Sequence, residues 1–581
     1  MASSRRRFIG TSAALTATTA GAVTAFHSRS STAQTGVEPL QISIASAPSP
    51  EIIALNRMGY GPRPGDIDRV RSMGLDTYIE EQLNPDAIND GDCDARLSGA
   101  RLRVKYDEIN ELRPLDLLDK STPELWERKS MTFREQQQAF YQVRIAAWIR
   151  AVYSKRQLQE VLVEFWHNHF NVNGPSSSEI ASTFPVYDRI MRKNCFGNFR
   201  AFLEEVGQSA AMMHYLNNVS NRAGGGEGSN ENYARELFEL HALGAENYLK
   251  FYDDRRNIGT IEYNGKTFVR GYIDEDVYEA ARCLTGWTIA NGRGEFGDSV
   301  PDNGTFYYHA NWHDTNPKTV LSPDGFTNIP RNQAALKDGK DVFDMLAGHP
   351  GTAHYVCTKL CRRLIADNPP SSVVAAAVST WMEHINSPDQ IKRVVRTILQ
   401  SNAFKTTWGK KIKRPFETVV SYLRATNADL QNDTLEDNRW DRVNWNVGNT
   451  GHWIFEYPAP TGYPDTMDYW VSTNGMLRRW NLPYILTQSW GGGVNIDLVG
   501  QTDLKKSCTE IVDGWIARLF GYEISSTVRE ALIAFMAQGG DVNKAPQPTE
   551  REPDWGNPEA VEDRLISMVQ LLASSPDFQT R

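Results

Sequence analysis

The sequence predicts a mainly α protein, built as one large multi-helix domain with long irregular loops and a few short β-hairpins. Apolar residues recur at helical spacing along most of the chain after residue 50. The helical runs are separated by long irregular stretches, of which the Trp-, Pro- and Gly-rich residues 430–474 are the clearest. The sequence has no internal repeat, so we do not expect a solenoid of stacked units.

The expected helices follow one another along the chain. A short helix begins at residue 51, and a second covers 66–83 before Asn84 and Pro85 stop it. A long helical block covers 132–170, with a break near Tyr153. Asn264 and Gly265 predict a tight hairpin turn. Further helices are expected over 183–191, 196–215, 232–244, 274–284, 339–367, 371–385, 389–401, 413–427, 475–490, 505–520, 525–537 and 558–574.

The composition is that of a globular protein, with 23% charged and 10% aromatic residues in 581. The 15 Trp residues favour aromatic packing over a carbohydrate-like binding face. The 6 Cys residues are scattered, without a Cys-x-x-Cys motif. Cys357 and Cys361 share a helix face, so a disulfide and a pair of buried free thiols both stay open.

The first residues predict an export signal. Arg5 and Arg6 belong to a twin-arginine pattern, and a weak apolar run follows it. That run is too short and too polar for a transmembrane helix. We therefore expect a signal peptide over residues 1–33, a linker over 34–49 and a single helical domain over 50–581, with the protein in the periplasm or outside the cell.

The charge of the chain excludes some partners. The formal net charge is −9, and removal of the signal peptide takes away four arginines and no acidic residue, which leaves −13. An acidic protein of this kind is a poor ligand for nucleic acids and for anionic membrane surfaces. No transmembrane segment is expected in the mature chain.

A set of short motifs is spread over nearly the whole mature chain. The motifs are residues 57–62, Phe165-Trp166-His167-Asn168-His169-Phe170, residues 235–241, Leu284-Thr285-Gly286-Trp287, His313-Asp314, Lys413 with Pro415-Phe416-Glu417, residues 458–464 and residues 574–578. In this order they resemble the bacterial DUF1800 family, an exported group named for its unknown function. The resemblance implies export and one large helical unit, and it implies no catalytic residue. One departure is visible, at residues 448–453, where such proteins tend to have Gly-Gln.

Residues 232–244 hold the strongest candidates for acid–base catalysis. Glu236 lies at the edge of the apolar stripe of this expected helix, where burial raises the pKa of a carboxylate. Glu239 lies beside it and His241 lies on the opposite flank. The alternative is structural: a surface ion pair, a helix cap and a core histidine. Asp276, on the following helix, is a third catalytic candidate or a group that orients metal ligands.

Several histidines suggest a metal site. His167 and His169 point about 200° apart on a continuous helix, so both reach one ion only if the last helical turn unwinds. His313 and Asp314 follow an aromatic strand, on a loop that an Asp side chain could also simply hold in a turn. We predict His167, His169, His241, His313 and Asp314 as metal ligands, with a divalent ion as the cofactor; core and capping roles are the alternative.

These residues lead to a first hypothesis, an exported enzyme with a metal-assisted site. Hydrolysis is the favoured reaction, because a metal-activated water needs only such ligands and one carboxylate base. The His-Glu-x-x-His and Gly-x-Ser-x-Gly motifs are both absent from the sequence, so a zincin and an α/β-hydrolase are excluded. The alternatives are a metal-dependent oxidoreductase and a non-catalytic envelope scaffold or binding protein that acts with another exported partner.

Overall fold

Helices form most of the computed structural model, which confirms the predicted mainly α class. The strands of the described residues pair only in two-stranded antiparallel sheets. The predicted signal peptide, residues 1–33, lies outside the described residues, and so does the linker as far as residue 46. The structure describes residues 47–224, 229–250, 254–293, 299–488, 492–548 and 559–581.

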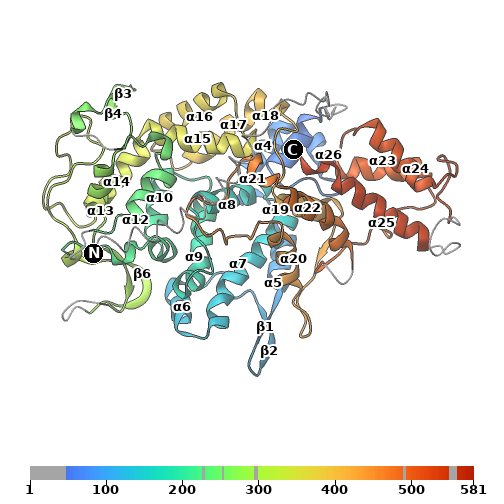
Figure 1. The fold of residues 1–581 in the computed structure, drawn as a ribbon, viewed down its shortest axis with the longest axis horizontal. Helices are drawn as coiled ribbons and strands as arrows, with labels where there is room; N and C mark the ends of the chain where they lie inside the picture. Colours follow the sequence, from blue (N-terminus) through green and yellow to red (C-terminus); the bar gives the residue numbers. More distant parts are fainter. Residues whose placement is uncertain (1–46, 225–228, 251–253, 294–298, 489–491, 549–558) are drawn as a thin grey trace, which may run out of the picture. The chain divides into compact units, whose positions relative to one another are not determined.

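The first part of the chain is mainly helical and contains one hairpin, which is labelled β1 and β2 in Figure 1. Gly74, with φ of 84°, divides the helix predicted over 66–83 into two. The break predicted near Tyr153 is present. The elements are α2 (Pro50–Arg57), α3 (Asp66–Met73), α4 (Leu75–Gln82), η1 (Pro85–Ala87), α5 (Gly91–Gly99), β1 (Arg101–Tyr106), β2 (Ile109–Pro114), α6 (Thr122–Trp126), η2 (Glu127–Ser130), α7 (Phe133–Tyr153), α8 (Gln157–His169), α9 (Ser178–Asn194), α10 (Phe199–Gly207), α11 (Ala210–Tyr215) and η3 (Asn218–Ser220).

The middle part contains two further hairpins, one of them at the predicted Asn264-Gly265 turn. The helix predicted over 339–367 is two helices, because Pro350 begins a new helix after His349. The elements are α12 (Asn232–Glu236), the π-helical turn η4 (Leu237–His241), η5 (Ala245–Asn247), η6 (Arg255–Asn257), β3 (Thr260–Tyr263), β4 (Lys266–Val269), α13 (Asp274–Cys283), β5 (Trp287–Asn291), β6 (Asp302–Tyr308), η7 (Ala310–Trp312), α14 (Lys337–Gly348), α15 (Pro350–Leu364), α16 (Ser371–Glu383), α17 (Gln390–Gln400) and α18 (Asn402–Thr406).

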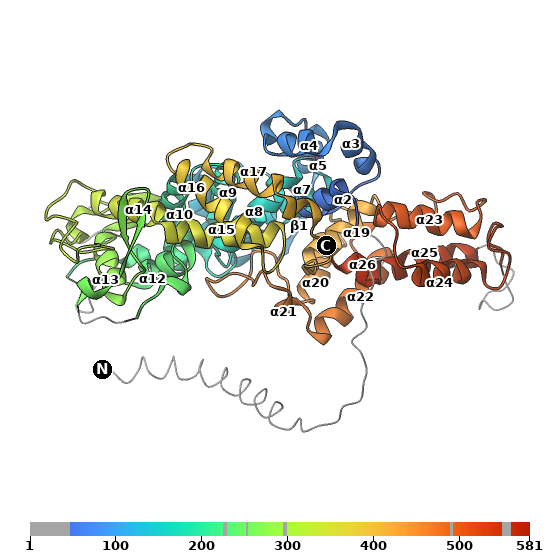
Figure 2. The same ribbon diagram turned by 90° about the horizontal axis from the view of Figure 1, so that it is seen from above.

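The last part is helical again, and its helices α23, α24 and α25 pack on one another (Figure 2). The region predicted as irregular, residues 430–474, contains two short helices between its loops. The elements are α19 (Pro415–Ala425), β7 (Asp429–Leu430), α20 (Arg439–Gly448), α21 (Met467–Trp470), α22 (Thr473–Thr487), β8 (Val494–Asn495), α23 (Cys508–Leu519), α24 (Ser526–Ala537), α25 (Glu559–Ser574) and α26 (Pro576–Gln579).

Two large hydrophobic cores hold these helices together. The first lies among α2, α8–α17 and the hairpin β5–β6, and the second among α5 and α19–α25. Helix α7 contributes to both, because Phe140 and Val143 lie in the first core while Ile145 and Trp148 lie in the second. One long helix shared by two cores couples their packing.

The buried side chains include all six cysteines, each a free thiol. The structure therefore has no disulfide between Cys357 and Cys361, and the buried-thiol alternative is confirmed. Within the described ranges, no helix is long and apolar enough to cross a bilayer.

The β5–β6 hairpin depends on a glycine, which gives a test of its packing. Gly304 has φ of +72°, and a Cβ there would lie 2.6 Å from the Trp126 ring. Gly265 has nearly the same φ, +73°, with no atom within 4 Å of such a Cβ. The positive φ destabilises both Gly→Ala variants. Gly304→Ala should lower the free energy of unfolding by about 1–3 kcal/mol more than Gly265→Ala, because its Cβ overpacks the Trp126 ring. Urea unfolding of both variants measures the difference, and equal losses would contradict this packing.

Candidate functional site

A cavity of about 550 Å³ lies where α6, α9, α11 and the β5–β6 hairpin meet. Two other cavities, of about 210 and 170 Å³, are much smaller. Ligand pockets in proteins are commonly about 300–1,000 Å³, and of these three cavities the first falls in that range. It is lined by Trp126, Lys129, Glu179, His214, Val219, Ser220, Arg222, Asn291, Arg293 and Trp312.

Aromatic rings form part of the cavity wall, and other contacts hold them in place. The rings of Trp126 and His214 lie 5.7 Å apart. The indole nitrogen of Trp126 donates a hydrogen bond of 2.5 Å to Asp302. Trp312 stacks on His309, with ring centroids 4.6 Å apart and planes 11° apart. These contacts fix the rings without a ligand, so the wall is preformed.

Among the described lining residues, Lys129, Arg222 and Arg293 are basic and Glu179 is acidic. Lys129 lies 4.5 Å above the Trp126 ring, and Arg222 lies 5.9 Å from the Trp312 ring. Burial lowers the pKa of His214; Arg293 and Lys129 lower it further, while Glu179 opposes the shift. Histidine 214 is therefore a neutral imidazole at pH 7, with a donor and an acceptor nitrogen.

Two polar atoms on the cavity-lining residues lack a hydrogen-bond partner. Nε2 of His214 and Nε1 of Trp312 are both buried, and neither has a partner among the residues that the structure describes. Buried polar atoms in native proteins are nearly always hydrogen-bonded to protein, water or ligand. Both atoms are therefore available for polar contacts with a bound molecule.

The predicted ligands His169 and His241 do lie close together, beside a lysine that the sequence analysis did not consider. Their ring centroids are 6.4 Å apart. Nε2 of His169 lies 3.1 Å from the His241 carbonyl oxygen, and Nδ1 lies 2.9 Å from Nζ of Lys359. The first contact requires His169 to donate through Nε2, so Nδ1 accepts from Lys359. Both ring nitrogens of His169 are therefore occupied.

A change of helix type produces this arrangement. The helix predicted over 232–244 is α-helical only to Glu236, and the π-helical turn η4 then ends at His241. The wider turn presents the His241 carbonyl oxygen to His169. Gly244 follows this turn with φ of +86°. A Cβ at this position would lie 2.5 Å from the Tyr355 ring, so both the backbone conformation and the close approach require glycine.

The predicted catalytic carboxylates lie apart from the cavity lining. Glu236 and Glu239 are half-buried on α12 and η4. Burial raises the pKa of Glu236 to about 7, and the charge of Glu239 raises it too. Asp276 is buried and accepts hydrogen bonds from the backbone nitrogens of Ile273 and Leu321, at 3.0 and 2.8 Å. Asp276 thus caps α13 and fixes a loop.

The remaining predicted ligands lie in two further places. His167 is hydrogen-bonded to Asp188 at 3.0 Å. His313 lies 3.2 Å from Asp338 and 2.9 Å from the backbone oxygen of Thr285. Asp314 pairs with Arg282 at 2.9 Å and accepts the Asn316 backbone N–H at 2.8 Å, as in a turn held by an Asp side chain.

The predicted metal ligands therefore do not share one location. Over the described ranges, no group of three or more His, Cys, Asp or Glu side chains could hold a metal ion. Of the five predicted ligands, His169 and His241 have neighbouring rings, and Nδ1 of His169 lies 2.9 Å from Nζ of Lys359. A shared metal centre stays a prediction without a geometric counterpart in these parts of the chain.

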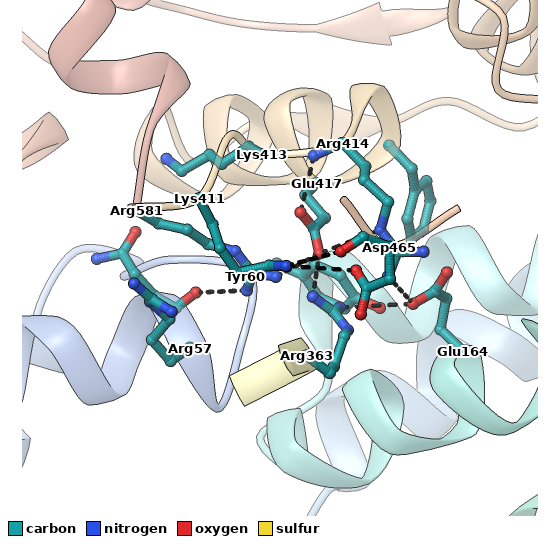
Figure 3. A network of polar contacts seen from close by, with 12 residues as sticks. Arg57, Tyr60, Glu164, Arg363, Lys411, Lys413, Arg414, Glu417, Asp465 and Arg581 are labelled. Carbon is teal, nitrogen blue, oxygen red and sulfur yellow. Dashed lines mark hydrogen bonds and ion pairs between the residues drawn. The ribbon is translucent and has the colours of Figure 1, made fainter. Parts of the chain in front are cut away.

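A buried ionic network, centred on Glu417, lies between the two hydrophobic cores (Figure 3). Oε1 of Glu417 forms an ion pair with Arg363, lies 2.9 Å from Nη2 of Arg581 and 3.7 Å from Nε of Arg414. Glu164 on α8 binds the same Arg414 at 2.7 Å and Arg363 at 3.4 Å. Burial alone would raise the pKa of Glu417, but the three arginines hold it well below its usual range.

Further charges extend the network toward the surface. Lys411 contacts Asp367 at 2.7 Å and Asp465 at 3.6 Å. Arg57 donates to the backbone oxygen of Ile365. Burial lowers the pKa of Lys413 to about 7, so this lysine is partly neutral at pH 7. The network joins α2, α8, α15 and α19 to the residues after α26.

Neither the cavity nor the network was predicted from the sequence. Trp312 directly precedes the His313-Asp314 motif, which was selected as part of a metal site. Trp126 and His214 are single residues on different helices, and no spacing rule connects them. For Glu417 a signal existed: Pro415 at the first helical position and Glu417 at the third are typical of a helix start. That pattern indicates a cap and carries no information about buried arginines.

The comparisons with known proteins identify the family. The profile of DUF1800, described as a protein of unknown function, matches residues 53–580. The chain therefore belongs to the DUF1800 family, as its motifs indicated. No curated protein and no solved structure shows significant similarity to it.

Loss of the Glu417 charge should strongly destabilise the fold. Glu417→Gln keeps the helix cap but leaves buried arginines without their carboxylate, at a cost of about 3–5 kcal/mol in the free energy of unfolding. Because the folded pKa of Glu417 is lowered, its contribution is present above the unfolded pKa of about 4.3 and is lost as pH falls through the folded pKa.

Urea unfolding measures this loss, and a matched variant controls for the cap. Glu510 occupies the same third position of α23 and accepts the Ser507 backbone N–H at 3.0 Å, but it is exposed. Glu510→Gln should change the stability little. Similar losses in the two variants would mean that Glu417 acts only as a cap.

Proposed function

We propose that this protein is exported by the twin-arginine route and binds a small ligand in the cavity, without catalysing a reaction. The observation that supports this most directly is a pair of buried polar atoms, Nε2 of His214 and Nε1 of Trp312, neither with a partner among the described residues. A buried polar group left without a partner costs about 1–3 kcal/mol. A ligand that forms hydrogen bonds to both atoms recovers that free energy.

The contacts of two predicted metal ligands, His169 and Asp314, and of the predicted catalytic residue Glu236 favour binding over metal-assisted hydrolysis or redox chemistry. A metal ion needs lone pairs that converge from several side chains. His169 has both ring nitrogens occupied, by a backbone oxygen and by Lys359. The carboxylate of Asp314 binds Arg282 and accepts the backbone N–H of Asn316. Glu236 has a raised pKa, but within the described residues it forms no hydrogen bond with a nucleophile.

The rigidity of the scaffold also suits a binding protein. The cavity wall consists of side chains on helices and a hairpin, and their positions are fixed by contacts outside the cavity. A preformed site loses little conformational entropy when a ligand binds. We propose that the protein meets this ligand in the periplasm or outside the cell.

The export part of the proposal predicts the fate of a signal variant. Replacing Arg5 and Arg6 by Lys should abolish export, because the route reads the arginine pair as an address. Immunoblots of the exported and cytoplasmic fractions measure the outcome. Arg29→Lys, which leaves the pair intact, should be exported normally. Export of the double variant at the normal level would contradict the twin-arginine route.

The binding part predicts stabilisation by a natural small molecule. A ligand that binds only the folded state raises the unfolding temperature by mass action. Some small-molecule fraction of the host should therefore raise the unfolding midpoint of the protein, but not that of Trp312→Ala. Trp480→Ala, at a 47% exposed Trp of α22, is the matched control and should respond normally. Equal responses of both variants, or no active fraction, would contradict the proposal.

A further inference from the structure

We infer that a second cavity, lined by residues of α2, α3, α4 and α19, binds a small oxyanion: a phosphate, sulfate or carboxylate group. This cavity is separate from the larger one, so the inference is independent of the proposed function. Its volume is about 170 Å³. A water molecule takes about 30 Å³ of the liquid, so this volume admits an ion of several heavy atoms.

A rigid loop places Arg63 at this cavity. Arg63 lies between Pro62 and Pro64, and the two proline rings restrict the backbone on both sides of it. Gly61 and Gly65 flank the prolines with φ of +95° and +89°, a conformation that favours glycine. The first motif of the family ends at Pro62, and the proposed function gives this motif no role. The backbone of Arg63 is therefore fixed before an ion binds.

The side chain of Arg63 forms no ion pair with any residue that the structure describes. One nitrogen of its guanidinium donates to Asn427 at 2.9 Å, and the guanidinium lies 5.4 Å from the centre of the Tyr153 ring. Arginine has five N–H donors in one plane. The remaining donors of Arg63 can therefore bind an oxyanion through paired hydrogen bonds.

Arg424 adds a second positive charge, which is buried. Its nitrogens donate to the backbone oxygens of Gly61 and Val152, at 2.7 and 2.8 Å, and to the carboxylate of Asp66 at 3.1 Å. Burial lowers the pKa of Arg424 to about 10; Asp66 opposes this shift, and the charge of Arg63 adds to it. The two arginines therefore repel each other, and an anion in the cavity that both line reduces this repulsion.

The other basic residues of the lining are already paired. Arg69 donates to both carboxylate oxygens of Glu81, at 2.5 and 2.6 Å. Lys155 lies 3.4 Å from Asp92 in an exposed pair. Two arginines, Arg63 and Arg424, then face a single carboxylate in the described lining, that of Asp66. The lining thus carries one positive charge in excess.

A phenol supplies a further donor. Tyr78 lines the cavity with 3% of its surface exposed, and its hydroxyl has no hydrogen-bond partner in the described parts of the chain. Burial raises the pKa of Tyr78, and the charge of Asp66 raises it too, so the hydroxyl keeps its proton and can donate it. Buried polar groups in native proteins nearly always have a partner, and an oxyanion in the cavity supplies one.

The direct test is titration calorimetry on the full chain in Tris buffer. The probes are sodium phosphate, sodium sulfate and sodium acetate, with sodium chloride as the ionic control. We expect an oxyanion to bind at one site per chain, about ten-fold or more tighter than chloride, because chloride cannot accept the paired hydrogen bonds of an arginine. Tighter binding of phosphate or sulfate identifies a tetrahedral ligand, and tighter binding of acetate identifies a carboxylate.

Variants assign the binding to this cavity. Arg63→Gln should weaken it about ten-fold or more, and Tyr78→Phe about five-fold, through the loss of a charged and of a neutral donor. Arg71→Gln is the matched control, because Arg71 is exposed on the same helix region, outside the lining, and the change of charge is the same. Arg71→Gln and Trp312→Ala should bind the oxyanion like the unaltered chain.

Three outcomes would overturn the inference: no oxyanion binds, chloride binds as tightly as the oxyanions, or Arg63→Gln and Tyr78→Phe bind as tightly as Arg71→Gln. None of them affects the proposed function, which the response of Trp312→Ala to the host fractions tests. If Arg63→Gln does not fold, Tyr78→Phe decides, since its side chain keeps the ring and loses the donor alone.

Discussion

The ion pairs of Glu417 are the interaction on which the rest of this structure depends. Three arginines that reach this carboxylate come from α15, the start of α19 and the last residue of the chain. None can be buried alone, because an isolated charge in a protein interior costs several kcal/mol. The network thus forces segments far apart in sequence to fold together, and it lies where the two hydrophobic cores meet.

This arrangement explains how a helical chain with long loops presents a rigid cavity. Helix α7 contributes to both cores, and α8 contributes Glu164 to the network and His169 to the contact with Lys359. The polar contacts of α8 are therefore structural, in a region where histidines first suggested a metal site. The cavity lies on α6, α9, α11 and the β5–β6 hairpin, and the hydrogen bond between His167 and Asp188 ties α8 to one of these elements, α9.

The sequence predicts the local structure better than the site. Helical periodicity located most helices, and the Asn264-Gly265 turn was correct, because both follow from short-range geometry. The π-helical turn at Leu237–His241 was missed, since apolar spacing does not distinguish it from an α-helix. The cavity was missed because Trp126, His214 and Trp312 converge only through tertiary packing. Two of the polar residues that were selected, Asp276 and Asp314, instead cap a helix and hold a turn. Aspartate is common in such structural roles and also in catalytic and metal sites, so the residue type alone does not separate the two.

The most direct test of the account is a crystal structure of the full chain with the ligand purified from an active small-molecule fraction of the host. The account predicts the ligand against the wall formed by Trp126, His214 and Trp312, with hydrogen bonds to Nε2 of His214 and Nε1 of Trp312. The wall should keep the same side-chain positions with and without the ligand. A ligand bound at another place, or a cavity closed by its own side chains, would contradict it.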